Sequence, residues 1–402
     1  MAGLSLCLLV AVGVVTWALV DSDPYVAPRP PVNEDPVDGD EASRSLKALQ
    51  QAVTDGDRAA AESVAPEGDD ATARLLRAIV DNAEALRVRD FRLRYVDEAS
   101  AASGDGAWSA AVDVTWRFDG FDAAPSHAEV SFRFRRDDDR VDLVGVGGGG
   151  ERTPVWLSGP VTVRRSSDTL VLAAGPTGRA AEYEQRARVA VADVGVMLPR
   201  LQPRLVVEVP ADAAALDAAL DAEPGEYAGI AAVTSSTDGS AAPGSPIHVF
   251  VNPEIYDRLG GIGAQVVMSH EAVHVATEAP NSTMPQWLLE GFADYVALRD
   301  VDLPFSVTAG QIIREVRREG PPDALPGPAE FGATDSHLGA AYESAWLACV
   351  VLADRAGEEA LVGFYGEMND GGDLADELSR RFQWTERAFV AAWQERLTDL
   401  AG

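Results

Sequence analysis

The spacing of hydrophobic residues changes several times along this chain, and each change marks a different kind of element. Apolar positions recur every three or four residues in two early segments, which predicts amphipathic helices over 45–63 and 71–87. Apolar and polar residues then alternate, as expected for strands that bury one face. The expected strands are FRLRYV from Phe91, WSAAVDVTWRF from Trp108, AEVSFRFRR from Ala128 and VDLVGV from Val141, with a charged turn at 137–139 before the last.

The pattern becomes mainly helical in the second half of the chain. Four glycines at 147–150 end the first region, and VTVRRSSDTLVLAAG over 161–175 has the pattern of a hairpin. Short apolar runs predict strands over 204–210, 229–233 and 247–253. Helices are expected over 179–201, 211–220, 263–277, 286–298, 308–318, 339–356, 358–368 and 374–398. A small sheet followed by helices predicts an α+β fold.

The first twenty residues are uncharged and long enough to cross a hydrocarbon core about 30 Å thick. We interpret 1–20 as a transmembrane signal anchor and 21–42, which is rich in proline and acidic residues, as an extended linker. A cleaved signal peptide is the alternative, although no basic residue precedes the apolar run and Ala18-Leu19-Val20 is a poor cleavage site. Both interpretations place the rest of the chain outside the cytoplasm; the first predicts a single-pass protein of the cell membrane.

Two folded units are expected between the linker and the C-terminus. Residues 43–150 would form the first and residues 179–402 the second, joined by a connecting hairpin over 151–178. Helices followed by an antiparallel sheet make the first unit resemble the NTF2-like α+β cone. This resemblance rests on the order of elements alone.

Composition excludes one class of partner. The net charge is −31 and the pI about 4.4, so the surface repels phosphate backbones, and nucleic acid is not expected as a partner. Two cysteines do not make a disulfide framework, because Cys7 lies in the apolar N-terminal run and Cys349 in an apolar helical stretch. We interpret Cys349 as a small residue of the core.

The segment HEAVH places His270 and His274 four residues apart, on one face of an expected helix. Their Cβ atoms would then be about 5 to 6 Å apart, so both imidazoles can reach one tetrahedral Zn²⁺ ion. Glu271 projects about 100° around the helix from His270, where it can take a proton from water at an open coordination position. Two core histidines on a buried helix are the alternative interpretation.

A second segment, WLLEGFADYVA, supplies carboxylates, and its Glu290 lies sixteen residues after His274. Glu290 on a neighbouring antiparallel helix would complete a His₂Glu set and leave the fourth position for water. Asp294 lies one helical turn further on the same face, where it can accept the other ring N–H of a liganding histidine. A solvated helix acid is the alternative for Glu290, and its spacing from HEAVH argues against that.

HEAVH followed by WLLEGFADY resembles the gluzincin zinc peptidases, especially the bacterial peptidase-MA-like group related to the M1 aminopeptidases. The resemblance extends from about Arg179 to the C-terminus and is tight only over 269–297. It implies a zincin-like domain that holds Zn²⁺, with Glu271 as general base and Asp294 orienting a ligand. The implied zinc ligands are His270, His274 and Glu290. No GxMEN-like segment is present, so aminopeptidase specificity is not implied.

Two further residues are candidates for binding the oxyanion. Tyr342 stands where such enzymes carry a tyrosine that donates to the tetrahedral oxyanion, and His337 is the other donor nearby. A tyrosine near a helix start can equally be a half-buried anchor. His127 and His248 lie in expected strands, and we interpret both as structural. A peptide could pair with the edge strand near 229–232.

The favoured interpretation is a membrane-anchored, extracytoplasmic zinc metallopeptidase that hydrolyses peptide or protein substrates. Two alternatives remain open. One is a non-enzymatic envelope protein with a structural zinc site and an NTF2-like domain that binds a partner. The other keeps zinc hydrolysis but directs it to a non-peptide amide.

Overall fold

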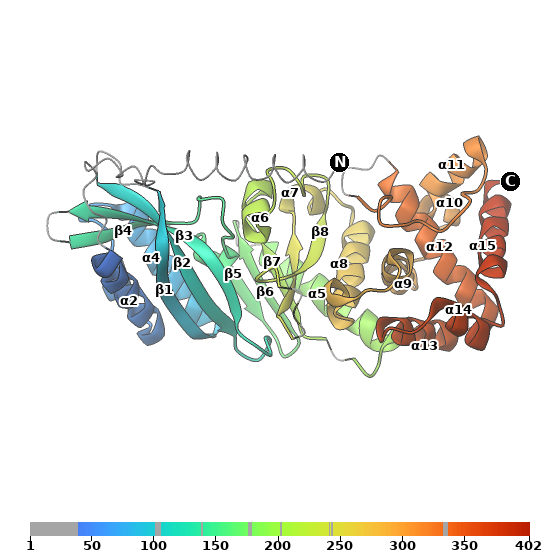
Figure 1. Cartoon of the computed structure of the whole chain (residues 1–402), viewed down its shortest axis with the longest axis horizontal. Helices are drawn as coiled ribbons and strands as arrows, with labels where there is room; N and C mark the ends of the chain where they lie inside the picture. Colours follow the sequence, from blue (N-terminus) through green and yellow to red (C-terminus); the bar gives the residue numbers. More distant parts are fainter. Residues whose placement is uncertain are drawn as a thin grey trace, which may run out of the picture. The chain divides into compact units, whose positions relative to one another are not determined.

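The computed structural model describes residues 39–402, except 101–105, 138–139, 176–178, 202, 241, 243 and 333–336. These residues form one compact unit of mixed α+β structure with two small sheets (Figure 1). The expected anchor over 1–20 and most of the linker lie outside the described residues. Among the helices that are described, none is long and apolar enough to cross a membrane.

The first part of the unit is a group of helices followed by an antiparallel sheet of four strands in chain order. Alternate residues of the second strand are buried throughout its length, as the sequence pattern predicted. The helices are α2 (Gly39–Asp55), α3 (Arg58–Glu62) and α4 (Asp70–Leu86), and the strands are β1 (Val88–Ser100), β2 (Ala107–Phe118), β3 (Ser126–Asp137) and β4 (Arg140–Val146).

The prediction of one helix over 45–63 is wrong, because the chain breaks between α2 and α3. Gly56 adopts a left-handed conformation with φ of 70°, which ends α2. Asp57 then starts α3, since its carboxylate accepts a hydrogen bond from the backbone N–H of Ala60 at 3.0 Å.

The second sheet has five strands in the order β5-β6-β7-β9-β8, with parallel pairing in its centre and antiparallel pairing at both edges. The expected hairpin over 161–175 forms, and it belongs to this sheet. The edge strand β8 begins three residues later than expected. The strands are β5 (Val161–Arg165), β6 (Thr169–Ala174), β7 (Leu205–Val209), β8 (Ala232–Ser236) and β9 (Ile247–Val251).

This second sheet lies between two hydrophobic cores. Leu170, Leu172 and Val206 pack with the core of the first four strands. Their neighbours Val171 and Val207 point the other way, into a larger core made with the helices. Both faces of the parallel strands are therefore buried, which explains their continuous apolar sequence.

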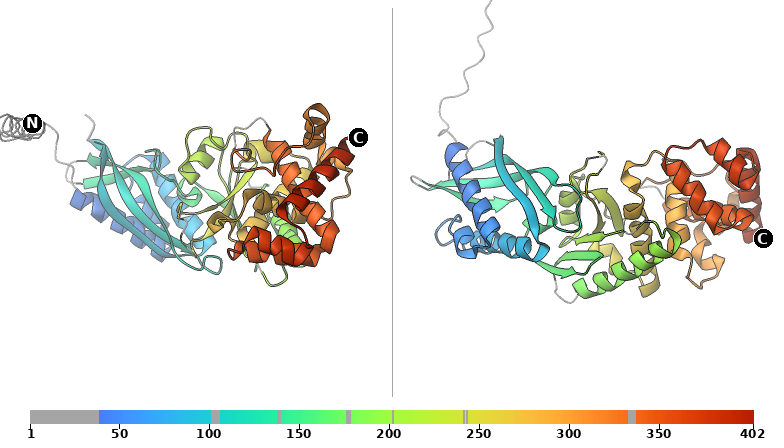
Figure 2. Two further views of the ribbon diagram at one scale, coloured as in Figure 1. Left: turned by 45° about the vertical axis from the view of Figure 1, so that its right-hand side comes forward. Right: turned by 90° about the horizontal axis from the view of Figure 1, so that it is seen from below.

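Helices cover the face of the sheet that points away from the first four strands, and α5 packs along the strands themselves (Figure 2). The remaining helices are η1 (Val155–Leu157), α5 (Arg179–Met197), α6 (Ala213–Leu220), α7 (Pro253–Tyr256), α8 (Gly261–Ala276), η2 (Ala279–Asn281), α9 (Gln286–Leu298), α10 (Phe305–Thr308), α11 (Gly310–Glu319), α12 (Leu338–Ala356), α13 (Glu358–Asn369), α14 (Leu374–Glu377), the π-turn η3 (Leu378–Phe382) and α15 (Glu386–Ala401). Cys349 is buried in α12, as expected for a core residue.

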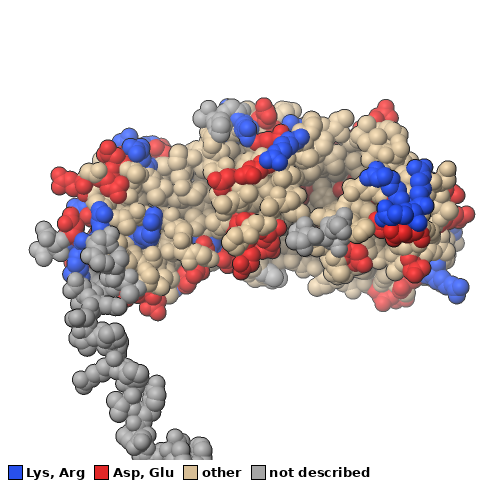
Figure 3. All heavy atoms as spheres, turned by 90° about the horizontal axis from the view of Figure 1, so that it is seen from above, with Lys and Arg blue, Asp and Glu red and all other residues tan. Residues whose placement is uncertain are grey.

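The single helix expected over 374–398 is also wrong. Gln383 takes a left-handed conformation with φ of 56°, which ends the π-turn η3. Thr385 then caps α15 by accepting a hydrogen bond from the backbone N–H of Ala388 at 3.2 Å. On the face of the molecule drawn in Figure 3, acidic side chains lie in several separate groups, with basic side chains among them.

His248 on β9 connects the second sheet to the loop after β2. Its Nδ1 lies 2.7 Å from a carboxylate oxygen of Glu208 on β7, and its Nε2 lies 3.0 Å from a carboxylate oxygen of Asp122. All three side chains are buried. Burial alone would lower the pKa of His248, but the two carboxylates outweigh it and raise the pKa to about 9. The imidazole is therefore a buried cation at neutral pH.

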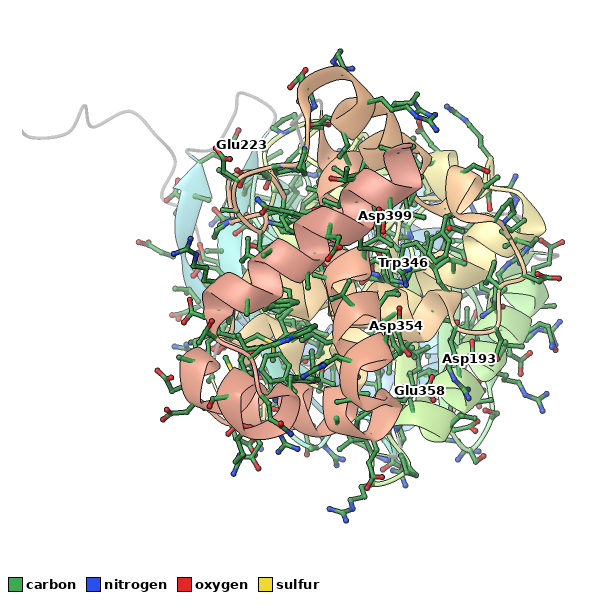
Figure 4. All side chains as sticks on the ribbon, turned by 90° about the vertical axis from the view of Figure 1, so that its right-hand side faces the viewer. Asp193, Glu223, Trp346, Asp354, Glu358 and Asp399 are labelled. Atoms are coloured by element: carbon green, nitrogen blue, oxygen red, sulfur yellow. The ribbon has the colours of Figure 1, made fainter. Side chains whose placement is uncertain are left out.

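Helices α9 and α12 approach each other closely at Gly291. A Cβ atom at this position would lie 2.3 Å from the backbone oxygen of Ala345 and 3.1 Å from the backbone nitrogen of Trp346, the residue labelled on α12 in Figure 4. Backbone atoms inside a packed helix pair cannot move aside at low cost. Gly291 therefore fixes the distance between the two helices.

Gly291→Ala is expected to lower the free energy of unfolding by about 3 kcal/mol, because the added methyl group forces the helices apart. Urea unfolding followed by circular dichroism measures this loss. Gly195→Ala in α5 is the matched control, since nothing lies within 4 Å of its added Cβ. The control is expected to gain up to about 1 kcal/mol. Equal effects of the two substitutions would contradict the packing role of Gly291.

Candidate metal centre

Helices α8 and α9 pack against each other, and their buried faces carry the two segments that the sequence singled out. HEAVH lies near the C-terminal end of α8, where Met268, Ala272 and Val273 anchor the helix in the core. Helix α9 starts directly after Pro285, so Glu290 lies in its second turn. His270, His274 and Glu290 are all buried.

Three side-chain atoms from these helices converge on one point. The Nε2 atoms of His270 and His274 are 2.9 Å apart, and the Oε2 atom of Glu290 lies 3.2 Å from each. The ligand atoms of all three residues lie within 4.8 Å of one another. Around a tetrahedral zinc ion with Zn–N distances of about 2.0 to 2.1 Å, neighbouring ligands are about 3.3 Å apart. The observed spacing is close to this value.

The hydrogen bonds around the histidines favour a cation at this point. The Nδ1 atom of His270 donates to a carboxylate oxygen of Asp294 at 2.8 Å, so the lone pair of Nε2 faces His274 and Glu290. The Nδ1 atom of His274 is buried and has no hydrogen-bond partner among the described residues. Two imidazoles and one carboxylate that meet in this way are a suitable donor set for zinc.

The opposite charges of the histidines and the carboxylates shift the pKa values of Glu290 and His270. Burial alone would raise the pKa of Glu290, but the imidazoles of His274 and His270 outweigh it and hold this pKa well below its usual range. Burial would likewise lower the pKa of His270, and the carboxylate of Asp294 reverses that effect. Glu290 and Asp294 thus lie on opposite sides of the His270 ring, Glu290 beside Nε2 and Asp294 beside Nδ1.

A cleft of about 280 Å³ opens over the three converging atoms. Its polar lining includes His270, His274, Glu271 and Glu290, together with the side chain of Thr234 from β8. The remaining walls are mostly apolar or aromatic and come from several elements. They are Tyr227, Ile230, Ala232, Val233, Ala279, Pro280, Leu289, Phe331 and Tyr342.

Glu271 faces this cleft and is held from the sheet side. The hydroxyl of Thr234 donates to its Oε2 atom at 2.6 Å and lies 3.2 Å from its backbone oxygen. Sequence reasoning missed Thr234, because no spacing rule relates a strand residue to a helix 37 positions away. The nearest signal was the expected edge strand near 229–232, with which a peptide substrate could pair.

The two candidate oxyanion donors lie in different places. Tyr342 lines the cleft, with its ring centroid 5.9 Å from that of His270 and 5.2 Å from that of Phe331. Burial raises the pKa of Tyr342, and the nearby carboxylates of Glu290 and Glu271 raise it further, so its hydroxyl remains a donor. His337 precedes α12, is largely exposed, pairs with Glu315 at 3.1 Å and is not among the residues lining the cleft.

Comparison with known proteins does not add a family to these observations. No protein-family model matches the chain, and no curated protein sequence matches it significantly.

Proposed function

We propose that this protein is a zinc metallopeptidase, on the strength of one observation. His270, His274 and Glu290 converge at the floor of a cleft, and Glu271 faces that cleft without being one of the three converging residues. A structural zinc site has four protein ligands, whereas a catalytic site has three and one open position. Three converging residues with another carboxylate beside them therefore favour a catalytic site over a structural one.

Each residue then has a distinct part in hydrolysis. Zinc at this site would activate water and polarise the scissile carbonyl. Glu271 takes the proton from the attacking water and passes it to the leaving amine. Asp294 keeps the His270 ring in the tautomer that presents Nε2. Tyr342 donates its hydroxyl proton in a hydrogen bond to the developing oxyanion.

The finer fold assignments belong to the same proposal. The helical part with the second sheet corresponds to a zincin-like domain, and α2 to β4 correspond to an NTF2-like cone. Edge strand β8 lies beside the cleft and could pair with an extended peptide substrate. Residues 1–20 would anchor the enzyme in the cell membrane, with the cleft on the extracytoplasmic side.

Metal analysis and a peptide library test the proposal together. Protein purified without chelator is expected to contain about one zinc per chain, and His274→Ala to contain much less. Hydrolysis of library peptides is expected to stop with a chelator and to return with added zinc. Full zinc occupancy without any hydrolysis would favour the structural-zinc alternative. Hydrolysis that chelators do not affect would reject the proposal.

A further inference from the structure

We propose that Thr234 is a positioning residue that holds the carboxylate of Glu271 in the orientation in which it takes a proton from water. This inference rests on the proposed function, since it assigns Glu271 as the general base. The observation behind it is the hydrogen bond from the Thr234 hydroxyl on edge strand β8 to the Glu271 carboxylate in the cleft. Thr234 is not one of the three residues whose ligand atoms converge, and on this proposal it acts through Glu271.

The geometry of the contact is that of a strong hydrogen bond. The Thr234 hydroxyl lies 2.6 Å from the Oε2 atom of Glu271, in the short range typical of a hydroxyl that donates to a carboxylate. The same hydroxyl lies 3.2 Å from the backbone oxygen of Glu271. Glu271 is only 7% exposed, so water competes poorly for this contact.

Thr234 is itself firmly held. It is the middle residue of β8, and it pairs with Val249 of β9 in a ladder that runs from Ala232 to Ser236. Val249 is fully buried in the centre of the second sheet. As a β-branched residue, threonine has a restricted χ1 angle, so its hydroxyl direction is set by the strand.

Glu271 needs such support because its side chain is long. Glutamate has three rotatable side-chain bonds, and a carboxylate beside an open cleft can adopt several rotamers unless a partner fixes it. A hydrogen bond to one carboxylate oxygen leaves the other oxygen to act on the proton. Displacement of a reacting group by about 1 Å can cost about 100-fold in rate.

The test compares Thr234→Val, which keeps the shape and loses the hydroxyl, with Thr234→Ser, which keeps the hydroxyl. The measurements are zinc content, kcat and KM for a peptide that the wild type cleaves. Thr234→Val is expected to lower kcat by about 10- to 100-fold at unchanged zinc content and unchanged KM. Thr234→Ser is expected to stay within about 3-fold of the wild type. Thr234→Ala replaces the valine variant if that variant does not fold.

Ser235→Ala is the matched control, because the next side chain on the strand points to the opposite face, and its hydroxyl donates to the backbone oxygen of the neighbouring Ser236. It is expected to leave kcat and KM unchanged. A crystal structure of Thr234→Val gives a readout besides activity. The Glu271 side chain is expected to leave the rotamer that it has in the wild type.

The possible failures are distinguishable. A wild type without zinc-dependent hydrolysis overturns the proposed function before any variant is compared. A wild type that is active while Thr234→Val keeps its kcat overturns only the role of Thr234. Loss of activity in Thr234→Ser, or an unmoved Glu271 in a Thr234→Val variant with lowered kcat, also overturns the positioning role.

Discussion

Glu271→Gln is expected to retain zinc and to lower kcat for peptide hydrolysis by about 10²- to 10⁴-fold. Glu271 is not one of the three residues whose ligand atoms converge, so the metal site should stay intact. Glutamine has the same shape, and its carbonyl oxygen can still accept the hydrogen bond from Thr234. It cannot take a proton from water. Zinc content and steady-state kinetics of the purified variant measure the two effects separately.

Glu278→Gln provides the control for this experiment. Glu278 lies just beyond the C-terminal end of the same helix, is exposed and does not line the cleft. Its substitution is expected to change neither zinc content nor kcat. Undiminished cleavage by Glu271→Gln would contradict the assignment of the general base, whatever the metal content.

His248→Leu is expected to lower the free energy of unfolding by about 4 kcal/mol. The substitution removes a buried cation and leaves the carboxylates of Asp122 and Glu208 without their common partner. Urea unfolding at pH 6 measures the loss. His127→Leu is the control, since His127 is exposed on β3 and its substitution is expected to change stability by about 0.5 kcal/mol or less.

The same residue predicts a pH dependence of stability. The pKa of His248 is about 9 in the folded protein and about 6.5 as the ordinary value, so the folded state binds the proton more tightly. This contribution is fully present below pH 6.5 and is lost as the pH rises toward 9. It amounts to about 3 kcal/mol at about 1.4 kcal/mol per pKa unit. A His248→Leu variant that loses as much stability as the wild type over this range would contradict this account.

The candidate metal centre could be predicted from the sequence because helix geometry is local. Four residues along a helix return to the same face, so HEAVH alone places His270 and His274 together. Glu290 and Asp294 required only one further assumption, that the next helix packs beside the first. That assumption is met in the structure, where Asp294 accepts from His270.

The contacts from the sheet could not be predicted in this way. Thr234 meets Glu271 because α8 packs against β8, and His248 meets Glu208 because β9 pairs with β7, so both contacts join segments that are distant in the sequence. Hydrophobic alternation identifies a strand and its buried face but contains no information on which strand lies beside it. The strand context of His248 therefore predicts a structural residue but not its two carboxylate partners.

The predicted helix boundaries are wrong where one residue adopts a left-handed conformation and ends the helix. The expected helices over 45–63 and 374–398 have continuous apolar spacing, yet Gly56 and Gln383 adopt left-handed conformations inside them. A glycine inside a periodic segment is compatible with either a helix or a break. Glutamine is usually a good helix former, so Gln383 itself does not mark the break, and the local signal is Thr385, a residue type that often starts a helix.

Because the second face of the five-stranded sheet is buried, the chain cannot be cut after residue 150 without exposing apolar strand residues. Parallel strands need cover on both sides, and here one cover comes partly from residues that precede the sheet in the chain. Expressed without residues 39–150, the remainder would lose much of the apolar cover over Leu170, Leu172, Val206 and Phe250, and it is expected to self-associate. The amino-terminal part thus shields this face of the second sheet from water.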